Sequence, residues 1–407
     1  SIETDFMSSF SISSRSENST PRIRGLSLLM VLVIIASNFS FAAPAIIPRP
    51  PGIAGTSYIL MDAKTGQILI EENADEALPP ASLTKIMTAY VATEEILSGN
   101  LALTDEVHIS EKAWRMEGSK MFVGVDTMVE VEDLLRGIII QSGNDSSVAI
   151  AEHIAGSEEA FADMMNQYAE VLGLTQSFFM NVSGLDTELY YNTMSARDLA
   201  LLAQATINRH AEFYPLYAER EFTYNGIRQS NRNTLLFRDR NVDGMKTGWT
   251  DAAGYCLVAS AERDGMRLIS VVMGTASEEA RAIETQKLLT YGFRYYETHK
   301  LYDSNQVLTN VPIFSGALNS VDLGIEDEVY ITIPRGQAEA MTATVDVGEV
   351  IHAPLSDRQI MGEVRVVLDN NILYQGNVVS MQAVEQGSFI KRFVDWITLL
   401  FSNMFSG

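Results

Sequence analysis

Between about residue 54 and residue 298, short apolar runs alternate with helical periodicities. Apolar runs at 57–62 and 67–71 flank turn residues at 63–66, which predicts a β-hairpin. A second hairpin is predicted at 255–261 and 266–274, because Asp264-Gly265 is a strong two-residue turn signal. Apolar residues three and four apart predict helices at 79–97, 130–155 with a break at 142–144, 157–172, 199–208 and 277–297. This mixture of helices and antiparallel strands predicts an α+β domain.

The pattern changes near His299. Four short β-like runs follow, separated by turns rich in Gly, Pro, Asn and Asp, at 329–333, 343–347, 362–368 and 377–381. We therefore expect a small all-β domain after the mixed domain.

The last segment, residues 386–405, is amphipathic. Its apolar residues fall on one side of a helix: Phe389, Ile390, Phe393, Val394, Ile397, Leu400, Phe401 and Met404. Lys391 and Arg392 lie on the other side. The segment is too short and too charged to span a bilayer, so we expect a helix lying in the membrane interface. Packing of this helix on the β-domain is the alternative.

The N-terminal segment is typical of a secretory signal peptide. Arg22 and Arg24 precede an apolar run of about 11 residues, and small residues follow at Ser40, Ala42 and Ala43. Cleavage after Ala42 is expected, with an uncleaved anchor as the alternative. The mature protein is then exported.

Composition and charge exclude several classes of protein. The 407 residues include 29 Lys and Arg against 52 Asp and Glu, a net charge of −23 that argues against nucleic-acid binding. The single cysteine, Cys256, rules out an internal disulfide. None of the five histidines pair at metal-ligand spacing, so no metal and no cofactor are expected.

Ser82-Leu-Thr-Lys85 is the first candidate for chemistry. Residues three apart share a helix face, which brings the Lys85 amine within reach of the Ser82 hydroxyl. A lysine can take the proton of a serine only if its pKa falls from about 10.4 toward neutrality, and burial and a second cation both lower it. Alone this motif is weak, because an ordinary surface pair has the same spacing.

Two further motifs follow in the chain. Ser142-Gly-Asn144 interrupts two apolar helices, where its side chains could relay a proton and hold a carbonyl, although a plain helix turn uses the same residues. Lys246-Thr-Gly248 precedes a strand. Lys246 could supply the second cation that lowers the pKa of Lys85, and Gly248 would let a ligand backbone approach closely.

Taken together, the three motifs and their order resemble the serine penicillin-binding proteins and β-lactamases. The stretches 80–88, 142–147, 184–186 with 195–198, and 242–250 resemble the low-molecular-mass D-alanyl-D-alanine carboxypeptidases, peptidase family S11. The resemblance implies a β-lactamase/transpeptidase-like domain. It divides the chain into a signal peptide at 1–42, a catalytic domain at 43–298, a β-rich domain at 299–385 and a membrane-anchoring helix at 386–407.

The resemblance also implies an activity: a serine removes the terminal D-alanine of peptidoglycan stem pentapeptides through an acyl-enzyme, and penicillins acylate the same serine. Ser82 matches the nucleophile, Lys85 the base, and Ser142 the proton shuttle. The residues that would bind substrate are Asn144, Lys246, Thr247, Gly248, Trp249, Arg232 and Arg281. The backbone N–H groups of Ser82 and Trp249 would form the oxyanion hole. Trp249 stands where relatives often have His.

Two alternatives stay open. A secreted serine β-lactamase is one, since Glu188 and Asn192 have the Glu-x-x-x-Asn spacing of class A enzymes, although the β-domain and the tail are not typical of them. A non-catalytic cell-wall scaffold is the other. The expected partners are a peptide ending in D-Ala-D-Ala, β-lactams as covalent inhibitors, and a membrane surface, with no nucleic acid. The expected location is the periplasmic face of the inner membrane.

Overall fold

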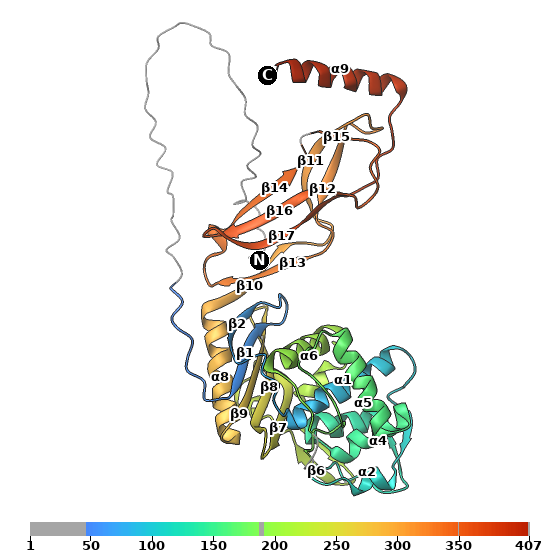
Figure 1. Ribbon diagram of the computed structural model, residues 1–407, viewed down its shortest axis with the longest axis vertical. Helices are drawn as coiled ribbons and strands as arrows, with labels where there is room; N and C mark the ends of the chain where they lie inside the picture. The colour runs from blue at the N-terminus through green and yellow to red at the C-terminus, as the bar shows by residue number, and fades with distance from the viewer. Residues whose placement is uncertain (1–45, 187–190, 349, 406–407) are drawn as a thin grey trace. The chain divides into compact units, whose positions relative to one another are not determined.

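The computed structural model describes residues 46–186, 191–348 and 350–405 (Figure 1). The expected signal peptide at 1–42 lies outside these residues. The chain divides into two compact units, which we call the first unit, residues 48–298, and the second unit, from His299 onward. Each has its own hydrophobic core.

A five-stranded antiparallel sheet organises the first unit. Its strand order is β2-β1-β9-β8-β7, with β1 at Ser57–Asp62, β2 at Ile68–Glu72, β7 at Val242–Thr250, β8 at Gly254–Arg263 and β9 at Met266–Thr275. Both expected hairpins are confirmed. In the turn between β8 and β9, Asp264 has φ 52° and Gly265 has φ 80°, the left-handed pair that a two-residue hairpin turn requires. Strand β7 is an edge of the sheet, so one side of its backbone is free of strand partners in the described chain.

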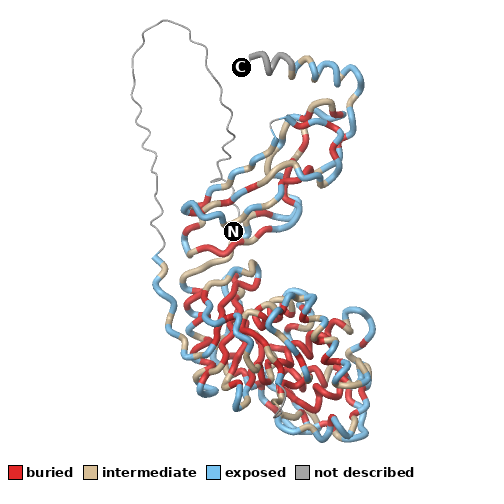
Figure 2. Tube along the Cα trace, in the orientation of Figure 1, coloured by how far each residue is buried: buried red, intermediate tan, exposed pale blue. Residues whose placement is uncertain are grey.

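Helices cover both faces of this sheet. α8, Glu278–Tyr295, packs on one face against β1, β8 and β9, and α6, Ala196–Arg209, packs on the other (Figure 1). The remaining helices of the first unit are α1 at Thr84–Leu97, α2 at Glu111–Arg115, α3 at Val131–Arg136, α4 at Asn144–Ala155, α5 at Glu158–Val171 and α7 at Leu235–Arg238. α1 contacts α4, α5 and α6, and most of it is buried (Figure 2).

Two local details place the candidate residues. Ser82 lies on a 3₁₀ turn, Ala81–Leu83, that precedes α1, whereas the sequence pattern predicted it within the first turn of the helix itself. The expected break at 142–144 is present, because a π-helical turn, Gly137–Gln141, ends at Ser142 with φ 64° and α4 begins two residues later. Such left-handed residues reverse the chain sharply.

Two small hairpins complete the first unit. β3, Glu106–His108, pairs with β4, Met128–Glu130, and β5, Glu221–Tyr224, pairs with β6, Ile227–Ser230. The start of α6 is capped, since the Ser195 side chain accepts a hydrogen bond from the Asp198 N–H.

The second unit is a β structure, as expected. Its six-stranded sheet has the order β14-β16-β17-β12-β11-β15, and β10 pairs with β13. These strands are β10 at Tyr296–Tyr302, β11 at Val307–Phe314, β12 at Ser320–Gly324, β13 at Val329–Pro334, β14 at Thr342–Val347, β15 at Ile351–His352, β16 at Ile360–Leu368 and β17 at Asn371–Ser380. A final helix, α9, spans Phe389–Phe405.

Candidate active site

A cavity of about 940 Å³ lies where β7, the 3₁₀ turn before α1 and the start of α4 meet. Eight of the predicted site residues line it, namely Ser82, Ser142, Asn144, Arg232, Thr247, Gly248, Trp249 and Arg281. Lys85 and Lys246 are buried, with 1% and 3% of their surfaces exposed. The fold thus gathers three motifs that are far apart in the sequence.

Ser82 and Lys85 are in direct contact. The Lys85 Nζ lies 3.1 Å from the Ser82 Oγ and donates another hydrogen bond, 2.6 Å long, to the carbonyl oxygen of Ser183. The pKa of Lys85 is lowered to about 7, chiefly by burial and then by the positive charge of Arg232, while the Asp145 carboxylate opposes the change. Near neutral pH a large fraction of this amine is therefore unprotonated and able to accept a proton.

The segment that carries Ser183 presses on the turn that carries Ser82. A Cβ atom placed on Gly184, which has φ +76°, would lie 1.8 Å from the carbonyl oxygen of Ala81. Only a glycine allows this approach. The contact fixes both the Ser82 turn and the carbonyl that holds the Lys85 amine.

Ser142 and Asn144 present unused polar atoms to the cavity. The Asn144 Nδ2 donates a 2.6 Å hydrogen bond to the Glu117 carbonyl. Within the described part of the chain, the buried Ser142 Oγ and Asn144 Oδ1 have no hydrogen-bond partner. Buried polar atoms are normally satisfied, so these two oxygens indicate where a ligand supplies the missing groups.

Strand β7 forms another wall of the cavity. A Cβ atom on Gly248 would lie 2.9 Å from the Pro80 carbonyl oxygen, so this glycine lets the strand lie against the start of the Ser82 turn. Thr247 is buried, while Trp249 is half exposed and its ring lies 5.7 Å from that of Tyr255. The end of this strand therefore borders the same space as the Ser82 hydroxyl.

Several cations converge behind this wall. Burial lowers the pKa of Lys246 well below its ordinary value, and the charges of Lys85, Arg232 and Arg281 lower it further. Arg281 is 4% exposed, so it is a buried group and not a solvated helix charge, and its Nη1 donates a 3.3 Å hydrogen bond to the Gly248 carbonyl. This concentration of positive charge favours a carboxylate ligand.

Lys85 and Lys246 repel each other, and this repulsion adds to burial in lowering the pKa of Lys246. Arg232 is a further cation near both amines, and its charge lowers the pKa of Lys85 as well. The sequence pointed to Lys246 as a cation near Lys85 and left Arg232 out of this role.

Sequence reasoning missed several groups at the site. Gly118 and Ser119 line the cavity, as does Glu278 at the start of α8, and Ser183 holds Lys85 through its backbone. A backbone contact leaves no signature in the side-chain pattern, so Ser183 could not have been found this way.

The residues that suggested a class A β-lactamase do not form a described pair. Glu188 lies outside the described residues. Asn192 is buried, and its side-chain amide donates hydrogen bonds to Thr84 and Asn181. Asn192 therefore connects two segments beside α1.

Comparison with known proteins identifies the family. Residues 45–277 match peptidase S11, D-alanyl-D-alanine carboxypeptidase, and residues 296–386 match the C-terminal domain of penicillin-binding protein 5. The D-alanyl-D-alanine carboxypeptidase DacA of Escherichia coli K12 is 43% identical over 367 residues, which cover 88% of this chain and 91% of that protein.

Solved structures agree. Penicillin-binding protein 5 from Haemophilus influenzae is similar with a TM-score of 0.79 and 41% identity, over 83% of this chain and 100% of that one. Penicillin-binding protein D2 from Listeria monocytogenes, in its ampicillin-bound form, has a TM-score of 0.56 and 29% identity, over 60% of this chain and 100% of that one.

These matches confirm the expected class, a transpeptidase-like α+β catalytic domain followed by a β-rich domain and a final helix. The chain belongs to peptidase family S11, the serine-type D-alanyl-D-alanine carboxypeptidases.

Proposed function

We propose that Ser82 attacks the carbonyl between the two terminal D-alanines of a peptidoglycan stem pentapeptide and that Lys85 is its base. The observation that carries this proposal is the 3.1 Å contact between the Lys85 Nζ and the Ser82 Oγ, in a cavity with a cationic wall. A neutral amine in that position can accept the hydroxyl proton as the new C–O bond forms.

Acylation follows from this geometry. The substrate carboxylate lies near Thr247, Arg232 and Arg281, while the Asn144 amide orients the peptide. The backbone N–H groups of Ser82 and Trp249 stabilise the negative oxygen of the tetrahedral intermediate. As the C–N bond breaks, the proton held by Lys85 reaches the departing D-alanine amine through the Ser142 hydroxyl.

Hydrolysis completes the cycle. A water molecule attacks the ester carbonyl of the acyl-enzyme and gives its proton to Lys85. Ser82 then leaves as the alcohol with that proton. The shortened peptide is formed as a carboxylic acid and loses its remaining proton to solvent as it is released as a carboxylate. The free enzyme is regenerated without any net change in its protonation.

Penicillins should acylate the same serine, because a β-lactam carries both a strained carbonyl and a carboxylate. The ampicillin-bound Listeria relative supports this proposal. Ser82→Ala should reduce covalent labelling by a fluorescent penicillin below detection, with an unchanged circular dichroism spectrum. Mass spectrometry of the wild-type adduct should map the label to the peptide that contains Ser82. Continued labelling of the Ser82→Ala protein at that peptide would refute the assignment.

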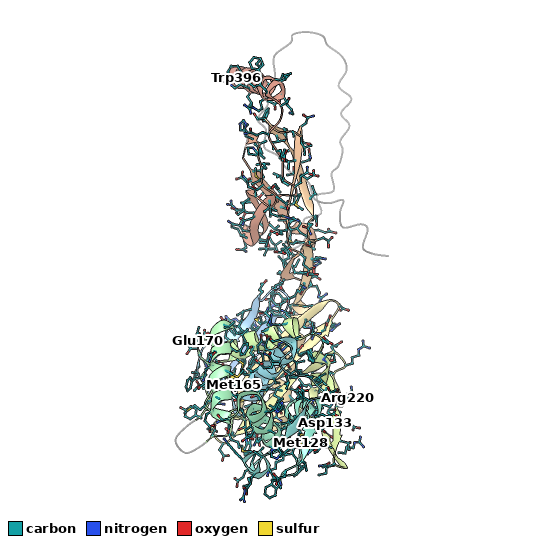
Figure 3. All side chains as sticks on the ribbon, turned by 90° about the vertical axis from the view of Figure 1, so that its right-hand side faces the viewer. Met128, Asp133, Met165, Glu170, Arg220 and Trp396 are labelled. Atoms are coloured by element: carbon teal, nitrogen blue, oxygen red, sulfur yellow. The ribbon has the colours of Figure 1, made fainter. Side chains whose placement is uncertain are left out.

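We also propose that α9 attaches the exported enzyme to the periplasmic face of the inner membrane. No helix in the described ranges is both long and apolar enough to cross a bilayer. On α9, Phe389, Ile390 and Trp396 are more than half exposed, and Figure 3 labels Trp396 on this helix. Arg392 donates a 3.3 Å hydrogen bond to the neutral Gln386 amide, so its positive charge remains available for anionic headgroups.

A further inference from the structure

The segment Glu117–Val123 forms a wall of the cavity, yet it has no regular secondary structure to hold it. Gly118 and Ser119 line the cavity, and the segment leads from α2 toward β4. A cavity wall without a ladder of backbone hydrogen bonds needs another support to keep its position.

That support is the carboxylate of Asp145, one residue after Asn144. Its Oδ1 accepts a hydrogen bond of 2.9 Å from the Met121 N–H, and its Oδ2 accepts bonds of 2.9 Å and 3.3 Å from the N–H groups of Phe122 and Val123. Asp145 is 1% exposed, so these bonds are shielded from water. One buried anion thus binds three consecutive backbone donors.

The backbone of the segment is shaped around this anion. Phe122 has φ 70°, an uncommon and unfavourable conformation for a bulky residue. A left-handed residue among neighbouring N–H groups creates a concave anion-binding nest. The Asp145 carboxylate occupies this nest and so explains why the strained conformation of Phe122 persists.

Hydrogen bonds also connect the Glu117–Val123 segment to Asn144, the residue before Asp145. The Asn144 N–H donates a 2.7 Å hydrogen bond to the Ser119 carbonyl, and its side chain donates to the Glu117 carbonyl. The latter bond fixes the orientation of the amide and leaves its Oδ1 free for a ligand in the cavity. Displacement of the segment would therefore move the Ser119 wall and release the Asn144 amide together.

We propose that Asp145 is a positioning residue: its carboxylate locks the Glu117–Val123 segment against the start of α4, and thereby fixes the Asn144 amide and the Ser119 wall for acylation. The inference rests on the proposed function, in which Asn144 orients the peptide. It adds a second role, because the negative charge of Asp145 also acts on Lys85.

The pKa of Lys85 provides a measure of the negative charge of Asp145, together with the other groups that act on the Lys85 amine. Positive charges act on it from Arg232 and from Lys246 on β7, Asp145 acts on it from α4, and Ser82 and the Ser183 carbonyl contact its amine. The Asp145 charge raises the pKa of Lys85. Its removal lowers that pKa, so the acidic limb of the pH–rate profile should move to lower pH, since neutral Lys85 is the reactive form.

Two substitutions separate geometry from charge. Asp145→Asn removes the charge and turns an N–H₂ group toward backbone N–H donors, whereas Asp145→Glu keeps the charge but displaces the carboxylate by one methylene. Both should lower the rate constant of acylation by benzylpenicillin roughly 100-fold, the cost of a misplacement of about 1 Å. Only Asp145→Asn should also shift the acidic limb to lower pH.

Asp198 offers a matched control. It is also a buried carboxylate in the first turn of a helix, and it holds another segment through the Gln176 N–H and the Ser177 hydroxyl. In the described chain, Asp198 is not among the residues that line the cavity or shift the pKa of Lys85. Asp198→Asn should lower the melting temperature while the acylation rate constant of the folded fraction and its pH profile stay at the wild-type values.

Hydrogen exchange tests the inference without activity. The amides of Met121, Phe122 and Val123 should exchange faster in Asp145→Asn and in Asp145→Glu, but not in Asp198→Asn. Unchanged exchange, a wild-type acylation rate in Asp145→Asn, or an equal loss in Asp198→Asn would each overturn the proposal. If Asp145→Asn does not fold, the amide exchange and the acylation rate constant of Asp145→Glu test the proposal, and wild-type values of either would overturn it. Absence of wild-type labelling would instead refute the proposed function.

Discussion

At the scale of single residues, the reactivity of Ser82 depends on the charges around one buried amine. Burial alone would favour a neutral Lys85, and the surrounding charges then adjust its pKa in opposite directions. Arg232 lowers it and Asp145 raises it, with a result of about 7. The pKa of Lys85 can therefore be shifted in either direction by changing a neighbour, without touching the proposed nucleophile or its proposed base.

Arg232 provides the test of this balance. Arg232→Met removes a positive charge, so Lys85 should hold its proton more tightly and its pKa should rise. The acidic limb of acylation should then move to higher pH by about one unit, a typical effect of one nearby charge. Stopped-flow acylation by a chromogenic cephalosporin between about pH 5 and 9, the range that brackets the expected pKa, measures this.

The direction of that shift is the decisive result. Arg232 also lines the cavity, so weaker binding is expected at every pH and is not informative by itself. Lys287→Met serves as the control, because Lys287 pairs with Glu284 on α8 and is not among the described residues that line the cavity. An acidic limb that stays in place, or moves to lower pH, would contradict the electrostatic account.

At the scale of elements, α9 differs from α1, whose apolar side chains are mostly buried. Five large apolar side chains on α9 are exposed, namely Phe389, Ile390, Phe393, Val394 and Trp396, while Ile397 and Leu399 are intermediate. The rings of Phe393 and Trp396 stack with centroids 6.1 Å apart. One polar contact joins α9 to the β structure, since the Asp395 carboxylate accepts a 2.7 Å hydrogen bond from the Ser315 N–H. The packing alternative considered from the sequence would bury this apolar side, whereas an anchoring helix would present its exposed residues to a membrane.

Deletion of 386–407 should therefore release the protein from membranes into the soluble exported fraction, with penicillin labelling unchanged. Fractionation of labelled cells measures both properties together. As a milder control, Phe393→Glu with Trp396→Glu should weaken binding to anionic vesicles while the helix and its Asp395 contact remain. Membrane association that survives the deletion would exclude α9 as the anchor.

The sequence predicts the secondary-structure elements better than the tertiary contacts between them. Both hairpins of the first sheet and the break at Ser142 follow from local signals, since Asp264-Gly265 and Ser142-Gly-Asn144 favour tight turns wherever they occur. The position of Ser82 on a 3₁₀ turn does not follow from local signals, because it depends on the approach of Gly184 from a distant segment. The binding of three backbone amides by Asp145 is likewise a tertiary effect.

At the scale of the molecule, the two units have separate cores. The buried cluster of the first unit runs from Ile59 to Met273, whereas that of the second unit runs from Tyr302 to Val384. Because no residue described as buried belongs to both clusters, each unit should unfold in its own cooperative transition.

A covalent ligand distinguishes the two transitions. Acylation by penicillin stabilises only the unit that contains Ser82, so it should raise the melting temperature of one calorimetric transition by several degrees and leave the other unchanged. Ser82→Ala serves as the control, in which neither transition should respond. A single transition that moves as a whole with penicillin would show that the units unfold together.

The assembly of the cavity from distant segments has a consequence for biosynthesis. Ser82 enters the folded unit from its beginning and Thr247 from near its end, with α4 between them. A nascent or partly translocated polypeptide that has only its early segments therefore has an ordinary serine without hydrolytic power. A peptide with the proposed D-Ala-D-Ala end would therefore not be cleaved before the whole of residues 48–298 has been synthesised and has folded.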